Sequence, residues 1–263
     1  MSERIRKRVL LFFGIAFIWS WSLWLPKVLL NFGIVCSDIW LSLSDFAVFG
    51  PLVAAIIITY IGLGKNHLRL LLIKGIRTDF RTIWLIPAIF LMPLFALLSF
   101  LFVIPIEGLY ILKNALPWQL LISFTLEIFL LGGPLGEEYG WRGFALERLE
   151  SKLNALISSL ILGVVVAFWQ LPLYFIQGTI QQYISIIPNT FIIILSSIIY
   201  TWLYNNTDKS VLITMILHLS TGVGSACFPY WASKVGSWIF CGCIFIFAII
   251  ILRIYGIKNL KSE

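Results

Sequence analysis

Charged residues are scarce in this sequence, and histidines are scarcer still. Asp, Glu, Lys and Arg make up 12% of the 263 residues, and 60% of the residues are hydrophobic, whereas a soluble domain carries about 25% charged residues. This balance excludes a soluble globular domain and indicates an integral membrane protein. The net charge of +7 is not gathered in a basic surface domain, so we expect no nucleic-acid partner.

Candidate metal ligands are also few. The chain has two histidines, His67 and His218, and four cysteines without the spacing of a metal site. A catalytic zinc ion takes three protein ligands, and His67 falls in a predicted surface loop. We therefore expect no metal and no other cofactor. Cys36 and Cys227 fall on the same predicted side of the membrane, but pairing cannot be read from sequence, and we do not predict a disulfide.

Long apolar runs predict eight transmembrane helices, because about 20 apolar residues are needed to cross the hydrocarbon core. The runs cover residues 9–26, 46–64, 82–104, 119–136, 155–176, 185–204, 211–228 and 237–256. The chain contains no Pro/Ser-rich linker, fixed-period repeat or low-complexity segment. We predict an all-α fold, a polytopic membrane helix bundle, with residues 1–263 forming a single integral membrane domain.

The basic residues predict the orientation of this bundle. With a cytoplasmic N-terminus, 16 of the 19 Lys and Arg residues fall on the inner side, and only Lys27, Lys113 and Lys234 fall outside. Cytoplasmic loops are enriched in Lys and Arg, so we expect a multi-pass protein of the cell membrane with both termini in the cytoplasm. The loop "KNHLRLLLIKGIRTDFR", residues 65–81, is typical of an amphipathic helix on the inner leaflet.

Two acids stand beside each other in an apolar region, in "GGPLGEEYGWRGFALERL" at residues 132–149. A charge at membrane depth costs several kcal/mol and therefore marks a paired or functional residue. On a helix, Glu138 and Arg142 lie four residues apart on one face and can pair. Glu137 points about 100° away, toward a cavity. From spacing alone, an alternative stays open, in which both acids only cap a cytoplasmic helix.

The glycines and proline before the acids predict a break in the apolar helix. Gly132, Gly133, Pro134 and Gly136 stand within five residues. Irregular backbone at membrane depth is tolerated only inside protein or beside a watery cavity, which favours a functional role for the acids slightly over a helix cap.

Three more polar residues fall inside predicted spans. Glu127 lies three helical turns before Glu138, and we expect it to be a neutral or hydrogen-bonded acid inside the bundle. Gln170 precedes Pro172, where a glutamine most often forms a helix-to-helix hydrogen bond. His218 lies in mid-span; such a histidine is usually a bonded core residue, although intramembrane histidines lean toward function.

Together these residues resemble the motifs of the CPBP (Abi/CAAX-protease) family of intramembrane proteases. The segment "EEYGWRG" matches the motif EExxxR at Glu137, Glu138 and Arg142. The segment "FWQLP" stands where the family has W-H-x-P, and "HLSTG" places His218 at the start of the motif H-x-x-x-N/D. The order and spacing agree over about residues 119–228, which resemble the family's catalytic core.

The resemblance implies a bundle whose polar cavity opens toward the cytoplasm. It also implies an endopeptidase that cleaves a membrane-associated peptide or protein with a glutamate-activated water. In these terms Glu137 is the general base, while Glu138 and Arg142 fix the helix. Gln170 positions the water and His218 stabilises the oxyanion. The partners are then the lipid bilayer and this substrate.

Two positions depart from the family's motifs. Gln170 replaces a histidine, and glutamine can orient water but cannot relay a proton. Gly222 replaces the last Asn or Asp, and losing one oxyanion donor costs about 100- to 1000-fold in rate. Ser220 or Thr221 would offer a hydroxyl only from another helix face.

These departures leave a second function open. The chain would then be a catalytically weakened family member that binds a membrane peptide or partner as a bacteriocin-immunity or regulatory protein. A transporter is a weaker third hypothesis, because broken helices and intramembrane acids also mark transport paths. The two halves of the chain show no repeat that would favour it.

Overall fold

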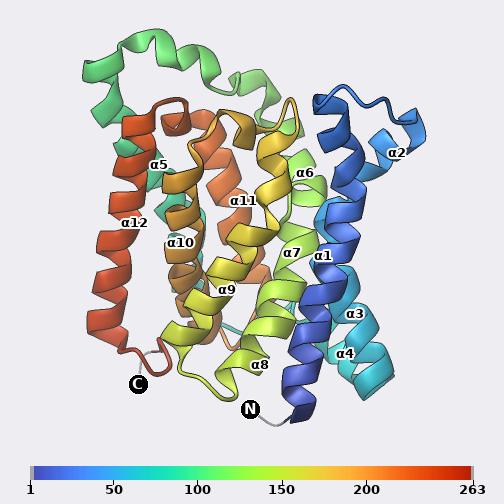
Figure 1. The fold of residues 1–263 in the computed structure, drawn as a ribbon. Helices are drawn as coiled ribbons and strands as arrows, with labels where there is room; N and C mark the ends of the chain where they lie inside the picture. Colours follow the sequence, from blue (N-terminus) through green and yellow to red (C-terminus); the bar gives the residue numbers. More distant parts are fainter. Residues whose placement is uncertain (1–2, 262–263) are drawn as a thin grey trace.

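The computed structural model describes residues 3–261, and within that range the chain is helical and has no β-strand. Figure 1 shows the α-helices packed side by side, with several running roughly parallel. They are α1 (Glu3–Asn31), α2 (Asp38–Leu43), α3 (Gly50–Leu63), α4 (Lys65–Ile73), α5 (Leu85–Glu107), α6 (Leu121–Leu131), α7 (Pro134–Gly140), α8 (Glu147–Glu150), α9 (Ala155–Trp169), α10 (Ile186–Asn206), α11 (Val211–Cys227) and α12 (Lys234–Tyr255). Short 3-10 segments and one π-helical segment, Trp141–Leu146, join them.

The expected polytopic membrane bundle is confirmed. Seven helical segments of the described range are long and apolar enough to cross a membrane. The remaining predicted span is α11, whose 17 residues extend about 26 Å and fall a little short of the hydrocarbon core. Because lipid offers the backbone no hydrogen bonds, helices are the form in which such apolar segments can cross. The chain is a multi-pass membrane protein.

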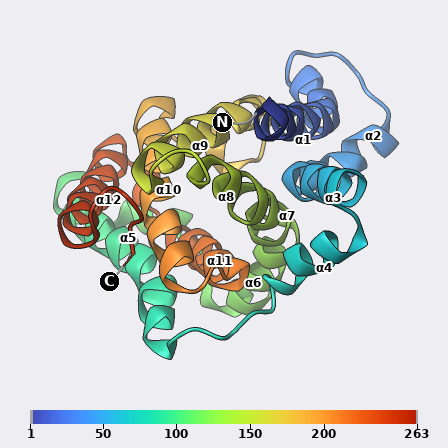
Figure 2. The ribbon, with the colours of Figure 1, turned by 90° about the horizontal axis from the view of Figure 1, so that it is seen from below.

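The helices pack in two groups on either side of the α7–α8 segment (Figure 2). One apolar core joins residues of α1, α3 and α9 with the α7–α8 segment, which contributes Trp141 and Phe144. The second core joins residues of α5, α10, α11 and α12. The segment that carries the two glutamates therefore has protein, rather than lipid, on both sides.

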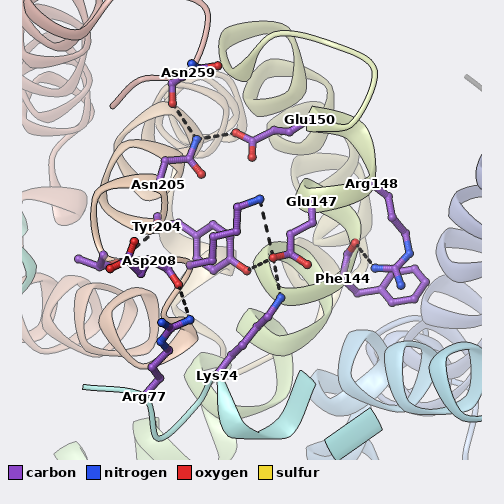
Figure 3. A network of polar contacts seen from close by, with 12 residues as sticks. Lys74, Arg77, Phe144, Glu147, Arg148, Glu150, Tyr204, Asn205, Asp208 and Asn259 are labelled. Carbon is purple, nitrogen blue, oxygen red and sulfur yellow. Dashed lines mark hydrogen bonds and ion pairs between the residues drawn. The ribbon is translucent and has the colours of Figure 1, made fainter. Parts of the chain in front are cut away.

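Both chain ends lie at the same end of the bundle (Figure 1), and a polar network covers it (Figure 3). Lys74 Nζ lies 2.5 Å from Glu147 Oε1, which also accepts a hydrogen bond from the Tyr204 hydroxyl at 3.0 Å. Asn205 donates to Glu150 at 2.6 Å. Burial lowers the pKa of Lys74, although the nearby Glu147 opposes this shift. These contacts join the segment after α4 to α8 and α10.

The predicted amphipathic helix is present at this same end, although it is shorter than expected. It forms α4, which ends at Ile73, and residues 74–81 continue as turns and irregular chain. Leu71 is buried against the bundle, while Lys65 and Arg69 are exposed. Its basic face is therefore free to meet lipid headgroups.

Candidate active site

The predicted helix break lies between α6 and α7. Gly133 has φ +116°, in the left-handed region that favours glycine. Pro134 then occupies the first position of α7, where its missing N–H costs no helical hydrogen bond. The Glu137 N–H donates to the Gly133 carbonyl at 2.7 Å. The break therefore places both glutamates in the first turns of a helix that starts inside the bundle.

Glu138 lies at the centre of a buried ionic cluster. Its Oε1 accepts hydrogen bonds from Arg142 Nη1 at 3.0 Å and from His218 Nδ1 at 2.9 Å. The Arg142 guanidinium also stacks 4.1 Å from the centre of the Tyr200 ring. The predicted Glu138–Arg142 pair is thus present. The bond to His218 was not predicted, because no sequence pattern shows that residues 80 positions apart will meet.

The bond to Glu138 also defines which atom of His218 is available. A carboxylate only accepts hydrogen bonds, so the proton of this bond resides on Nδ1 of the imidazole. The other ring nitrogen, Nε2, is left for a ligand. Glu138 therefore both neutralises Arg142 and orients the histidine.

A π-helical segment, Trp141–Leu146, follows α7 directly. Such one-turn π segments add a residue to the helical turn and frequently occur at functional sites. Here the segment buries Trp141 completely, with its ring against Phe12 and Trp169. The Trp141 indole N–H donates to Glu137 Oε2 at 3.3 Å, so the tryptophan holds one oxygen of this carboxylate.

Glu137, Gln170 and His218 line one cavity of about 460 Å³. Their predicted convergence is thereby confirmed, although the three residues come from α7, the end of α9 and α11. Glu137 is only 4% exposed, so it faces this cavity rather than bulk water. The geometry favours the cavity over the helix-cap interpretation.

Glycine at position 133 keeps the space between the two candidate side chains open. A β-carbon there would lie 3.0 Å from His218 Cε1 and 3.1 Å from Glu137 Cδ. The sequence identified Gly133 only as a helix breaker. Its second property, close approach to the carboxylate and the imidazole, depends on the fold.

Glu127 differs from the expectation of an acid inside the bundle. It is an exposed residue of α6, which has no buried residue at all, and it lines the cavity with Ile128. The expectation placed Glu127 on the same face as Glu138 of one continuous helix, whereas the break at Gly132 and Gly133 separates α6 from α7.

The position of the missing Asn or Asp is filled by an apolar side chain. A β-carbon on Gly222 would meet Ile128 Cδ1 at 2.9 Å. The nearby hydroxyls do not replace the lost donor, because Ser220 donates to the Ala88 and Leu217 carbonyls and Thr221 donates to the Leu217 carbonyl. The cavity wall at this point is therefore apolar.

The cavity lies toward the end of the bundle opposite both termini. Its outer wall includes Lys27 and Asp45, paired at 2.7 Å. Thr179 and Gln181, from the connection between α9 and α10, complete this rim. A cytoplasm-facing cavity and cytoplasmic termini were both expected. The two expectations exclude each other. Helix α1 runs from the end with the termini to the opposite end (Figure 1), and Lys27, near the end of this helix, lines the cavity.

The arrangement offers a buried carboxylate, an amide and an imidazole around one polar space. Among residues 3–261, no three His, Cys, Asp or Glu side chains form a metal-binding group. The chemistry that these residues can supply themselves is proton transfer by Glu137, water orientation by Gln170 and hydrogen bonding by His218.

Comparison with known proteins identifies the family of this chain. Residues 93–223 match the family model of type II CAAX prenyl endopeptidase Rce1-like proteins. A relative described as CAAX prenyl protease 2, from Methanococcus maripaludis, is 30% identical over 224 residues, which cover 79% of this chain and 80% of that protein. The fold is that of a multi-pass membrane protein, and the comparisons place it in a family of membrane proteases. The chain belongs to the Rce1-like CAAX prenyl endopeptidase family, as its motifs predicted.

Proposed function

We propose that the chain is an intramembrane endopeptidase that uses Glu137 to activate water. The observation that carries this proposal is the convergence of Glu137, Gln170 and His218 on one cavity. The Glu137 carboxylate is buried, and the Trp141 indole N–H bonds to its Oε2. The other carboxylate oxygen, Oε1, is left to bind water. Membership of a protease family supports the same reaction.

The reaction follows from the positions of these groups. The Glu137 carboxylate takes a proton from a water held by the Gln170 amide, and the resulting hydroxide adds to the peptide carbonyl carbon. His218 Nε2–H donates to the oxyanion, while the Nδ1–H bond to Glu138 stabilises the charged ring. Glu137 then returns the proton to the leaving nitrogen as the C–N bond breaks. Because glutamine relays no proton, Glu137 performs both transfers.

The experiment is a search for new peptide ends in membranes that contain the protein. Membranes from cells expressing the wild type or Glu137→Gln are incubated in water enriched in ¹⁸O, and the new peptide ends are then compared by mass spectrometry. We expect pairs of fragments that appear only with the wild type, one with a new free N-terminus and the other with ¹⁸O in its new C-terminal carboxylate. Identical sets of ends from both strains would remove the peptidase proposal.

The alternative is a binding protein, of the bacteriocin-immunity or regulatory kind, that has lost most of its activity. The observation in its favour is the apolar wall at Gly222, where Ile128 occupies the place of an oxyanion donor. A cellular phenotype, such as protection from a secreted peptide, separates the two. Protection that persists in Glu137→Gln at normal protein levels supports binding, whereas protection lost with the carboxylate supports catalysis.

A further inference from the structure

We propose that substrate enters the cavity from the extracytoplasmic side, and that it is an exported peptide or an extracytoplasmic segment of a membrane protein. This rests on the proposed function, because it concerns the same cavity. It differs from the entry side that the sequence resemblance implied. Three features of the molecule carry it: the position of the rim, the distribution of basic residues, and the closed opposite end.

The rim of the cavity is formed by parts of the chain that lie far from the termini. Lys27 and Asp45 flank the connection between α1 and α3, and Thr179 and Gln181 lie between α9 and α10. Glu137 and His218 form the inner part. A peptide that reaches Glu137 through this cavity must therefore pass the end of the bundle opposite the termini.

The basic residues identify the end with the termini as cytoplasmic. Of the 19 Lys and Arg residues, three lie at the rim end and Arg142 is buried in the bundle. The other fifteen belong to segments at the end with the termini. They include the exposed Lys65 and Arg69 of α4, and each basic residue near an anionic leaflet contributes about 1 kcal/mol. The opposite orientation would require moving these charges across the membrane.

The hollow found at the cytoplasmic end, among residues 3–261, does not reach Glu137. This hollow, of about 640 Å³, is lined by His67, Lys74 and Arg148 among others. Neither Glu137 nor His218 contributes to its wall. The π-helical segment Trp141–Leu146 follows Glu137 toward this end, and its side chains Trp141 and Phe144 are fully buried. A cytoplasmic peptide would meet packed aromatic side chains instead of the carboxylate.

One wall of the cavity faces lipid, which suits a substrate that approaches along the outer leaflet. This wall is α6, whose residues are all at least partly exposed. Its residues Glu127, Ile128 and Leu131 line the cavity. An extended segment at the outer membrane surface can therefore reach the site without crossing the bilayer.

The test is labelling of single cysteines in intact cells with a membrane-impermeant maleimide. The background removes the native thiols by Cys36→Ser, Cys227→Ser, Cys241→Ala and Cys243→Ala. Gln181→Cys reports on the rim, Ile128→Cys and Leu131→Cys on the interior of the cavity, and Lys65→Cys on the end with the termini. Each variant is used only if its thermal melting temperature and membrane level match those of the background.

We expect the rim and cavity cysteines to be labelled in intact cells, and Lys65→Cys only after permeabilisation. The reverse pattern would overturn the proposal and place the cavity in the cytoplasm. Labelling of Gln181→Cys from outside but of both cavity cysteines only after permeabilisation would also overturn it, because the cavity would not open at its rim. Labelling does not depend on catalysis, so failure of the peptidase proposal would leave this result unchanged.

Discussion

Removing the charge of Glu138 should destabilise the protein far more than its small change in size suggests. Glu138 is fully buried, and Arg142 is 6% exposed, so Glu138→Gln leaves the guanidinium without its counter-ion in the bundle. Breaking a buried ion pair by removing one partner costs about 3–5 kcal/mol. The bond that orients His218 is lost in the same step.

The chain contains a matched control for this prediction. Glu3 and Lys7 have the same four-residue spacing and lie 2.7 Å apart, but their side chains are about 70% exposed. Because water screens such a pair, Glu3→Gln should cost less than about 1 kcal/mol. The assay is denaturant unfolding of both variants in the same detergent. Equal small losses of unfolding free energy would refute the role assigned to the buried cluster.

Three further predictions concern the cavity and the end of the bundle where both termini lie. Gly133→Ala should abolish cleavage while Gly178→Ala, also at positive φ but with no atom within 4 Å of its new β-carbon, should retain it; peptide cleavage at equal protein levels checks this. Gly222→Asn alone should lower the melting temperature because it meets Ile128, whereas Gly222→Asn with Ile128→Ala and Gln170→His should raise the cleavage rate. Burial lowers the pKa of folded Lys74 below 10.5, its ordinary value. Between these two pKa values the unfolded chain binds more protons than the folded protein, so the free energy of unfolding should rise as the pH increases from the lower to the higher value. Lys74→Met should lose this rise in pH-dependent unfolding, and the exposed Lys65→Met should keep it.

The positions of the membrane helices were readable from sequence because lipid imposes a strong constraint. Each of the eight apolar runs coincides with helical segments, and the break at Gly132 and Gly133 occurs where the glycines predicted it. The pair of Glu138 with Arg142 was also predictable, because residues four positions apart lie just over one helical turn from each other on the same face.

The features that the sequence did not reveal depend on contacts between distant segments. The bond from His218 to Glu138 joins α11 to α7, and Ile128 of α6 packs directly against Gly222 of α11. Neither contact follows from periodicity. The resemblance predicted a cavity that opens toward the cytoplasm. This prediction conflicts with the orientation predicted from the basic residues, because the rim of the cavity lies at the end of the bundle that has few Lys and Arg residues.

The most direct test of the central claim is the cleavage rate of purified Glu137→Gln in liposomes. The substrate is a peptide that contains a cleavage site found in the wild-type membranes, and the melting temperatures of both proteins are measured beside the rate. A general base contributes about 100- to 10,000-fold, so we expect a loss of that size with unchanged melting. Cleavage by the variant at close to the wild-type rate would contradict the assignment of Glu137 as the base.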